Sequence, residues 1–187
     1  MKSSTYSRRK FLGMSAVAAG ATLGTKTLLL HPEPLLAADA SSAGDRVRFG
    51  IIGIGMQGSN LLAQSIELPG IECVAACDLY DGRHTLAREI TAKPNLPVTR
   101  RYQELLANKD IDCIVAAVPD HWHKQVVVDA VTAGKDIYCE KPMSHSPADG
   151  VAMVEATKRT GRIVQIGSQR VSSLICAKAK EMISQGM

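Results

Sequence analysis

The stretch GIIGIGMQGS, residues 50–59, decides the fold because it holds three glycines in a GxGxxG arrangement, Gly53, Gly55 and Gly58. The first glycine permits a tight turn, the second lets a pyrophosphate approach the backbone, and the third lets a helix pack closely against the preceding strand. The pattern is specific only between a strand and a helix. In that context it predicts a dinucleotide-binding loop, with a tight turn that binds no ligand as the alternative.

The residues around this loop supply the required context. The β-branched run 47–52 precedes it and predicts a strand, and the segment 57–67 that follows has the pattern of a helix. The N-terminus of that helix offers unpaired N–H groups and a partial positive charge to phosphates. Ile54, Met56 and Gln57, which lie between the glycines, are therefore predicted to contact the cofactor as well.

The rest of the chain repeats the order of strand and helix. Further strands are predicted at 71–77, 95–100, 112–118, 136–139 and 162–167, and further helices at 82–91, 102–106, 121–133, 146–160 and 172–185. The long strands are apolar without polar alternation, which is typical of a parallel sheet covered by helices on both faces. We therefore predict a doubly wound α/β Rossmann domain over residues 47–170.

Asp78 ends the second predicted strand, 20 residues after Gly58. An acid at this place accepts hydrogen bonds from both ribose hydroxyls of the adenosine half and repels a 2′-phosphate, which favours NAD. Arg83 lies nearby and could pair with such a phosphate, so NADP is the alternative cofactor. Without a ligand, Asp78 would be a turn residue or the cap of the next helix.

The segment PDHWH follows the strand predicted at 112–118. Pro119 lies at the carboxyl end of this strand, and Asp120 is predicted to cap the next helix. His121 and His123 form an HxH pair, but a zinc site needs three or four ligands and no further ligand has a suitable spacing, so no metal site is predicted. Pro119 and either Trp122 or His123 are predicted to line the dinucleotide crevice. The alternative is a group of surface or core residues at a helix terminus.

The segment IYCEKPMSH, 137–145, places Glu140 and Lys141 directly after an apolar strand. In a parallel sheet this position lies at the carboxyl edge, where ligands bind. Pro142 fixes the chain as it leaves the sheet, which a simple surface ion pair would not require. We predict that Glu140 and Lys141 border the ligand, with a surface ion pair as the alternative.

Composition argues against a nucleic-acid surface. The 187 residues are 45% hydrophobic, but only 4% are aromatic, and proteins that bind single strands use aromatic side chains as stacking platforms. Residues 1–40 hold five of the 22 basic and two of the 18 acidic residues, so the remainder, with 17 basic and 16 acidic residues, is nearly neutral. No nucleic-acid partner is therefore predicted.

The N-terminus resembles a twin-arginine export signal. Arg8 and Arg9 precede an uncharged stretch, 11–25, that is shorter than the roughly 20 apolar residues of a membrane span. Ala38-Asp39-Ala40 is a small-x-small cleavage pattern. We predict export to the periplasm or cell envelope by the twin-arginine translocase, cleavage after Ala40 and a linker at 41–46. An uncleaved anchor or a chance basic N-terminus is the alternative.

The five cysteines are an odd number and contain no CxxC pair. Four of them lie in or beside apolar runs, where a free cysteine behaves as a small hydrophobic residue. An exported chain could pair them, but a twin-arginine substrate folds in the reducing cytoplasm first. Structural thiols are therefore predicted.

Together these motifs resemble the glucose–fructose oxidoreductase/inositol dehydrogenase/rhizopine-catabolism (Gfo/Idh/MocA) family. The resemblance runs from about Arg46 to the end of the chain and rests on the glycine loop, Asp78, VPDHWH (118–123), AGKDIYCEKPMS (133–144) and VQIGSQR (164–170). It implies that the Rossmann domain binds NAD(P) and that a second, α+β domain covers the nicotinamide and shapes a sugar site.

The resemblance also implies roles for individual residues. Glu140 and Lys141 would line the nicotinamide and the substrate. Lys141 would hydrogen-bond a sugar hydroxyl and orient the carbon that gives up hydride. His123 would lie beside the cofactor as a second catalytic candidate, and Gln169 would lie near the nicotinamide. The acid–histidine pair usually assigned as general base belongs to the second domain.

Members of this family are much longer than 187 residues, so we expect the second domain to lie outside this chain, with 171–187 as a helix leading towards it. For the whole protein we predict an exported NAD(P)-dependent oxidoreductase that acts on a sugar, polyol or glycoside and forms a homo-oligomer. One alternative is an NAD-dependent, redox-neutral glycosidase of the same family. Another is a non-catalytic dinucleotide-binding fragment.

Overall fold

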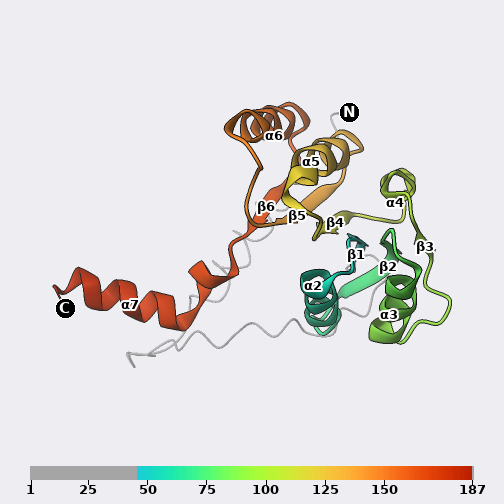
Figure 1. The fold of residues 1–187 in the computed structure, drawn as a ribbon, viewed down its shortest axis with the longest axis horizontal. Coiled ribbons are helices and arrows are strands. Elements are labelled where there is room, and N and C mark those ends of the chain that lie inside the picture. The colour runs from blue at the N-terminus through green and yellow to red at the C-terminus, as the bar shows by residue number, and fades with distance from the viewer. Residues whose placement is uncertain (1–45, 187) are drawn as a thin grey trace, which may run out of the picture. The chain divides into compact units, whose positions relative to one another are not determined.

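The computed structural model describes residues 46–186, which contain a six-stranded sheet (Figure 1). Every strand pair is parallel, and the order is β3-β2-β1-β4-β5-β6. The strands are β1 (Val47–Ile52), β2 (Ile71–Cys77), β3 (Val98–Thr99), β4 (Cys113–Ala116), β5 (Asp136–Glu140) and β6 (Val164–Gly167).

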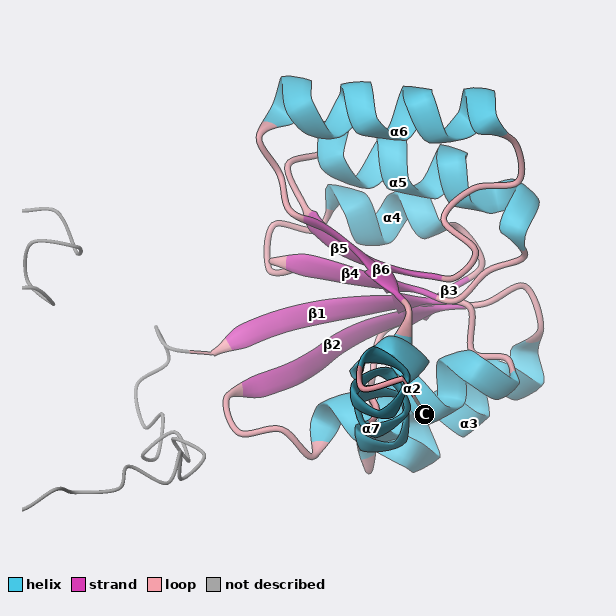
Figure 2. Ribbon diagram, turned by 90° about the vertical axis from the view of Figure 1, so that its left-hand side faces the viewer, coloured by secondary structure: helices cyan, strands magenta, loops and turns pink. Residues whose placement is uncertain are grey.

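Helices connect the strands and cover both faces of the sheet. They are α2 (Met56–Ile66), α3 (Asp81–Thr91), α4 (Tyr102–Ala107), α5 (His123–Thr132), α6 (Pro147–Thr160) and α7 (Leu174–Ser184), with two 3-10 helices, η1 (Asp120–Trp122) and η2 (Gln169–Ser172). Figure 2 shows α4, α5 and α6 on one face of the sheet and α2 and α3 on the other. The predicted doubly wound Rossmann fold is therefore confirmed.

The two faces of β1 contribute to two separate cores. Phe49 and Ile51 pack with Leu62 of α2 on one face, and all three side chains are buried. Ile52 belongs to the core beneath α4, α5 and α6 on the other face. A strand that is buried on both sides has to be apolar at consecutive positions, which explains why the strands lack polar alternation.

The strand order places a ligand crevice next to β1. From β1 the chain proceeds outward through β2 and β3, and then returns to the other side of β1 as β4. Ile52 and Ala116 are paired neighbours near the ends of these two strands. In doubly wound sheets the ligand lies outside the carboxyl ends of the strands, where the order reverses in this way. The functional site is therefore expected above the ends of β1 and β4.

The end of α6 nearest the functional edge is built as the sequence predicts. Ser146 is the N-cap and its Oγ accepts a hydrogen bond of 3.2 Å from the Asp149 N–H, while Pro147 is the first helical residue. A proline there costs no hydrogen bond, because the first N–H groups of a helix have no partner within it. Gly161, in the left-handed conformation at φ +66°, ends the helix.

The largest difference from the sequence prediction follows β4. This strand ends at Ala116, and the helix predicted at 121–133 is divided into η1 and α5. Trp122, and not Asp120, caps α5. The Trp122 N–H donates to the Pro119 carbonyl (2.9 Å), so a tight turn comes first and delays the helix.

All five cysteines are free thiols, as predicted. Burial raises the pKa of the Cys73, Cys77 and Cys139 thiols to about 12 and that of Cys113 to about 11. Cys73, Cys77 and Cys139 are buried in the core and Cys113 is partly buried against it, so all four are uncharged thiols at neutral pH. Cys176 on α7 is exposed.

Several predictions concern parts of the chain other than this sheet. The predicted export signal, residues 1–40, and all but the last residue of the predicted linker lie outside the described residues. Residues 46–186 include no helix with the length and apolar character of a membrane span. The helix predicted at 172–185 is present as α7 with every residue exposed, and its role as a connection to a second domain stays a prediction.

Candidate functional site

The glycine loop joins β1 to α2 and is tightly packed at two of its three glycines. Gly53 has φ +87°, and a Cβ on it would lie 2.5 Å from the carbonyl oxygen of Ala117. A Cβ on Gly58 would lie 1.9 Å from the Gly53 carbonyl oxygen. These glycines therefore allow the turn and the close approach of helix to strand that the sequence predicts.

Gly55 differs from the other two because a Cβ there would meet no atom within 4 Å. It is the N-cap of α2, and no side chain caps this helix end. Met56, the first residue of α2, is 83% exposed. The loop thus presents open space in front of helical N–H groups, which is the arrangement that binds phosphate.

Asp78 connects the glycine loop to the end of β2. Its Oδ2 accepts a hydrogen bond from the Ile54 N–H (2.7 Å), and its Oδ1 accepts one from the Tyr80 N–H (2.9 Å). Each oxygen keeps a lone pair, and the side chain is only partly buried, so a ribose hydroxyl can still bind. The carboxylate therefore holds the loop in shape, and the predicted ribose contact stays a prediction. The side chain of Arg83 forms no hydrogen bond or ion pair within residues 46–186.

His123 is buried, with 1% of its surface exposed, at the start of α5. Its Nδ1 lies 2.6 Å from the Pro142 carbonyl oxygen and its Nε2 lies 3.0 Å from the Val118 carbonyl oxygen. Both partners are acceptors, so the ring donates to one of them or, when doubly protonated, to both. Neither nitrogen is left for a substrate. The structure therefore favours a role for His123 in positioning the backbone over the predicted catalytic role beside the cofactor.

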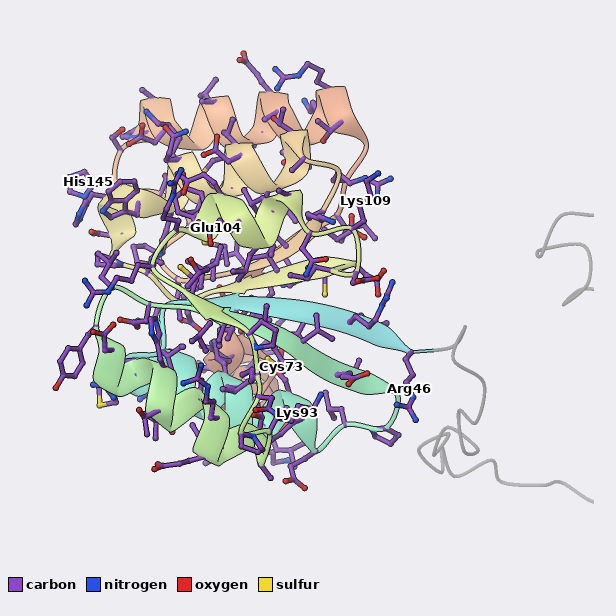
Figure 3. The ribbon with its side chains drawn as sticks, turned by 90° about the vertical axis from the view of Figure 1, so that its right-hand side faces the viewer. Arg46, Cys73, Lys93, Glu104, Lys109 and His145 are labelled. Carbon is purple, nitrogen blue, oxygen red and sulfur yellow. The ribbon has the colours of Figure 1, made fainter. Side chains whose placement is uncertain are left out.

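A second histidine also connects the segment after β4 to the segment after β5. Whereas His123 follows β4 and contacts Pro142 after β5, this histidine follows β5 and contacts a residue after β4. His145, after β5, has its Nδ1 3.3 Å from Oδ2 of Asp120, after β4. The hydrogen bond with His145 holds the pKa of the Asp120 carboxyl below its usual range. In Figure 3 His145 lies at the end of the domain opposite Arg46, the residue before β1, and so at the carboxyl edge of the sheet. The two loops are thus joined by His123 and by His145.

Glu140, the last residue of β5, is buried, with 4% of its surface exposed. Its Oε1 accepts hydrogen bonds from Nε2 of Gln57 on α2 (3.1 Å) and from Nε2 of Gln169 on η2. Its Oε2 accepts one from the Lys141 N–H (3.2 Å). The carboxylate therefore joins the first turn after the glycine loop to the loops that follow β5 and β6.

Lys141 follows Glu140 and is exposed at the rim, and the Lys141–Pro142 peptide bond is cis. Its ammonium forms no hydrogen bond or ion pair with another residue of the described range. The chain beyond it is held in place, because the Pro142 carbonyl contacts buried His123. An unpaired ammonium on a fixed backbone is suited to bind a hydroxyl group of a ligand.

This geometry agrees with a comparison to known families. The model of an oxidoreductase family with an NAD-binding Rossmann fold, GFO_IDH_MocA, matches residues 47–168.

The chain belongs to the Gfo/Idh/MocA family.

This Gfo/Idh/MocA chain is similar to several individual proteins. Inositol 2-dehydrogenase of Salmonella typhimurium is 34% identical over 145 residues, which are 75% of this chain and 42% of that protein. A glycosyl hydrolase family 109 protein of Shewanella baltica is 29% identical over 171 residues, 82% of this chain and 37% of that protein. The crystal structure of the WlbA dehydrogenase from Bordetella pertussis in complex with NADH and UDP-GlcNAcA has a TM-score of 0.67 at 26% identity, covering 75% of this chain and 42% of that chain.

The Gfo/Idh/MocA Rossmann fold binds NAD, and the residues of this chain fit that cofactor. Gly55 leaves room for the pyrophosphate, and the uncapped end of α2 offers N–H groups to it. Asp78 lies at the end of β2, on the adenosine side of the crevice, and Glu140 lies at the end of β5, on the nicotinamide side. The place of Lys141 beside the substrate and the nicotinamide stays a prediction.

The structure brings the predicted site residues to one edge of the sheet. They end or follow β1, β2, β4, β5 and β6 and are Gly53, Ile54, Gly55, Met56, Gln57, Gly58, Asp78, Pro119, His123, Glu140, Lys141 and Gln169. The side chain of Ile54 is fully buried, so only its backbone could contact a cofactor. Its backbone N–H already donates a hydrogen bond to Asp78. Within residues 46–186 no group of three potential ligands lies close enough together to hold a metal ion.

Two residues near this edge, Tyr138 and His145, were not predicted from the sequence. The Tyr138 hydroxyl accepts a hydrogen bond of 2.8 Å from Nε2 of Gln169. Tyr138 lies two residues before Glu140 and so on the same face of β5, a periodicity that could have revealed it. His145 pairs with Asp120 across 25 residues of chain, and no local pattern indicates that contact.

Proposed function

We propose that this chain is the dinucleotide-binding part of an exported, NAD-dependent oxidoreductase that acts on a polyol or sugar. The observation that carries the proposal is the buried Glu140 carboxylate, which joins Gln57 of the glycine loop region to the segment of Lys141. This bond fixes the phosphate-binding end of the crevice relative to the lysine at its rim. A cofactor and a hydroxyl-bearing substrate can therefore meet at a defined place.

In the proposed reaction the residues of this chain bind and orient the cofactor and the substrate. The bound NAD supplies the hydride acceptor, its nicotinamide ring. The Lys141 side chain binds the hydroxyl on the carbon to be oxidised. As a neutral amine it can accept the proton that this hydroxyl loses while the hydride leaves the carbon, and it can return that proton in the reverse reaction. His123 holds the Pro142 carbonyl and so fixes the backbone that carries Lys141. The chain spans about 42% of the length of the inositol 2-dehydrogenase that it matches, so the activity of the whole protein is part of the proposal.

The substrate class is supported by the relatives. The similarity to inositol 2-dehydrogenase favours a cyclic polyol. The test is to incubate the whole protein with NAD and a panel of polyols and sugars, and to follow formation of NADH. Lys141→Ala should lower the turnover number by roughly 10²–10⁴-fold. Lys158→Ala is the matched control, because Lys158 is exposed on α6 and makes no hydrogen bond or ion pair within the described range. Normal turnover of Lys141→Ala would contradict the role of this lysine.

A second function is favoured by the similarity to a glycosyl hydrolase family 109 protein, which extends over 82% of this chain. An enzyme of this kind would use NAD without net oxidation of its substrate. The same Lys141 would bind the substrate hydroxyl in both cases. Release of sugar from a glycoside without accumulation of NADH would favour the glycosidase. Binding of NAD by the whole protein without either turnover would favour a non-catalytic dinucleotide-binding protein.

Export is supported by the twin arginines, Arg8 and Arg9, and by the cleavage pattern that ends at Ala40. The double substitution Arg8→Lys and Arg9→Lys keeps the charge but alters the motif. It should retain the protein in the cytoplasm, whereas the unchanged chain should be found in the periplasm or envelope after cell fractionation. Identical distribution of the two would contradict export by the twin-arginine translocase. The predicted homo-oligomer stays a prediction, which light scattering on the whole protein can test.

A further inference from the structure

Glu140 is a buried charge whose hydrogen-bond partners are all neutral. The side-chain amides of Gln57 and Gln169 and the backbone N–H of Lys141 donate to it. A carboxylate that receives three donors is in the hydrogen-bonding pattern of its ionised form, which can only accept. In residues 46–186 no Lys, Arg or His side chain lies within ion-pair distance of it. Its negative charge is thus solvated by dipoles but not neutralised.

This charge lies directly beneath the surface at the carboxyl edge of the sheet. Gln57 and Gln169 are exposed, while the carboxylate that they contact is 4% exposed. The negative charge also acts on its neighbours on β5. Burial and then the charge of Glu140 raise the pKa of the Cys139 thiol to about 12. For Tyr138 burial is again the largest cause of a raised pKa, and the Glu140 charge adds to it.

The nicotinamide half of the cofactor lies on the same side of the crevice. A doubly wound sheet binds the two halves of a dinucleotide on the two sides of the strand-order reversal. Asp78 marks the adenosine side at the end of β2, and Glu140 is at the end of β5 on the other side. The nicotinamide ring carries one positive charge when oxidised and none when reduced. A fixed negative charge in a site of low dielectric therefore interacts differently with the two forms.

We propose that Glu140 makes the crevice prefer the oxidised over the reduced form of the cofactor. The inference rests on the proposed function, in that it places the nicotinamide beside β5, and it goes further by assigning Glu140 an electrostatic role. A carboxylate that merely held Gln57 and Gln169 in place would affect both forms of the cofactor equally. The ratio of the two affinities separates the electrostatic role from the structural one.

The experiment is a calorimetric titration of the 187-residue chain with NAD and, separately, with NADH. Glu140→Gln removes the charge and keeps the shape of the side chain. Two opposite charges roughly 10 Å apart, at an effective dielectric constant of about 20, change an affinity by about tenfold. The ratio of the NADH to the NAD dissociation constant should therefore fall about tenfold in Glu140→Gln. Glu155→Gln is the matched control, because Glu155 is exposed on α6, and its ratio should equal that of the unchanged chain.

A second variant guards against a general loss of structure. Glu140→Asp keeps the charge but shortens the side chain, so it should weaken both affinities and preserve their ratio. An unchanged ratio in Glu140→Gln, with binding of both forms intact, would overturn the electrostatic role and leave the proposed function in place. Failure of the unchanged chain to bind either form would overturn both. Circular dichroism of each variant establishes that it is folded before titration.

Discussion

The two glycines Gly55 and Gly58 should respond in opposite ways to the same substitution. In Gly55→Ala the new methyl group enters open space, and the backbone, at φ −69° and ψ −165°, is one that alanine adopts freely. In Gly58→Ala the methyl group would lie 1.9 Å from the Gly53 carbonyl oxygen, so α2 has to move away from β1. The first substitution therefore tests the ligand site and the second tests the packing.

The magnitudes follow from these contacts. Gly55→Ala should change the free energy of unfolding by no more than about 1 kcal/mol, because a compatible Gly→Ala substitution chiefly restricts the unfolded chain. Its methyl group blocks the approach of a phosphate to the backbone, and the loss of one charged hydrogen bond weakens NAD binding roughly 10–100-fold. Gly58→Ala should cost at least about 1–3 kcal/mol, since the clash is with backbone, and should lower the melting temperature by roughly 3–15 °C.

Two measurements on each variant separate these effects. Thermal denaturation without ligand reports the packing, and calorimetric titration with NAD reports the site. NAD binding by Gly55→Ala that equals that of the unchanged chain would refute the placement of the pyrophosphate at this loop. A Gly58→Ala variant as stable as the unchanged chain would refute the argument from close packing.

Four further outcomes follow from the described contacts. Asp78→Ala leaves the N–H groups that donate to its two oxygens without partners, so urea denaturation should show a loss of about 1–3 kcal/mol; an unchanged midpoint would contradict its role in holding the loop. His123→Ala removes a buried ring and two contacts to carbonyls, so it should lower the free energy of unfolding by about 2–4 kcal/mol, and a loss below about 0.5 kcal/mol would contradict the role of His123 in holding the Val118 and Pro142 carbonyls. Glu72 has a lowered pKa, chiefly because Nζ of Lys93 donates a hydrogen bond to it at 2.6 Å. Its contribution to stability is therefore present at neutral pH and is lost as the pH falls below 4.5. The unchanged chain should lose more stability on acidification than Glu72→Gln does, and equal losses would contradict this. Ellman's reagent should label Cys176 rapidly in the folded chain and the buried Cys73, Cys77 and Cys139 only after denaturation, so rapid labelling of any of these three would show that the cores are open.

Local patterns in the sequence predict the fold and the edge of the sheet at which the predicted site residues lie. The GxGxxG pattern between a strand and a helix, and the continuously apolar strands, depend on neighbouring residues, and the structure contains both as expected. The sequence predicted a doubly wound parallel sheet but not the order of its strands. The tight turn at Asp120–Trp122 was not predicted, because the same residues are also compatible with the first turn of an α-helix. Only the i to i+3 hydrogen bond from Trp122 to Pro119 distinguishes the two.

Contacts between distant segments could not be predicted from the sequence. His123 was expected beside the cofactor, but the sequence did not indicate that its ring lies between the Val118 and Pro142 carbonyls. Glu140 receives a hydrogen bond from Gln57, which lies 83 residues earlier in the chain. Both contacts depend on which strand ends become neighbours after folding. A linear pattern indicates that residues share the carboxyl edge, but not which of them touch.

The central claim is that the carboxyl edge of this sheet is an NAD site, and a titration of the 187-residue chain with NAD tests it most directly. Binding should be saturable with one NAD per chain. At a free NAD concentration of about 100 times the dissociation constant, the ligand should add about 2.7 kcal/mol to the free energy of unfolding and raise the melting temperature. The absence of saturable binding and of any shift in melting temperature, with a correctly folded chain, would contradict the claim.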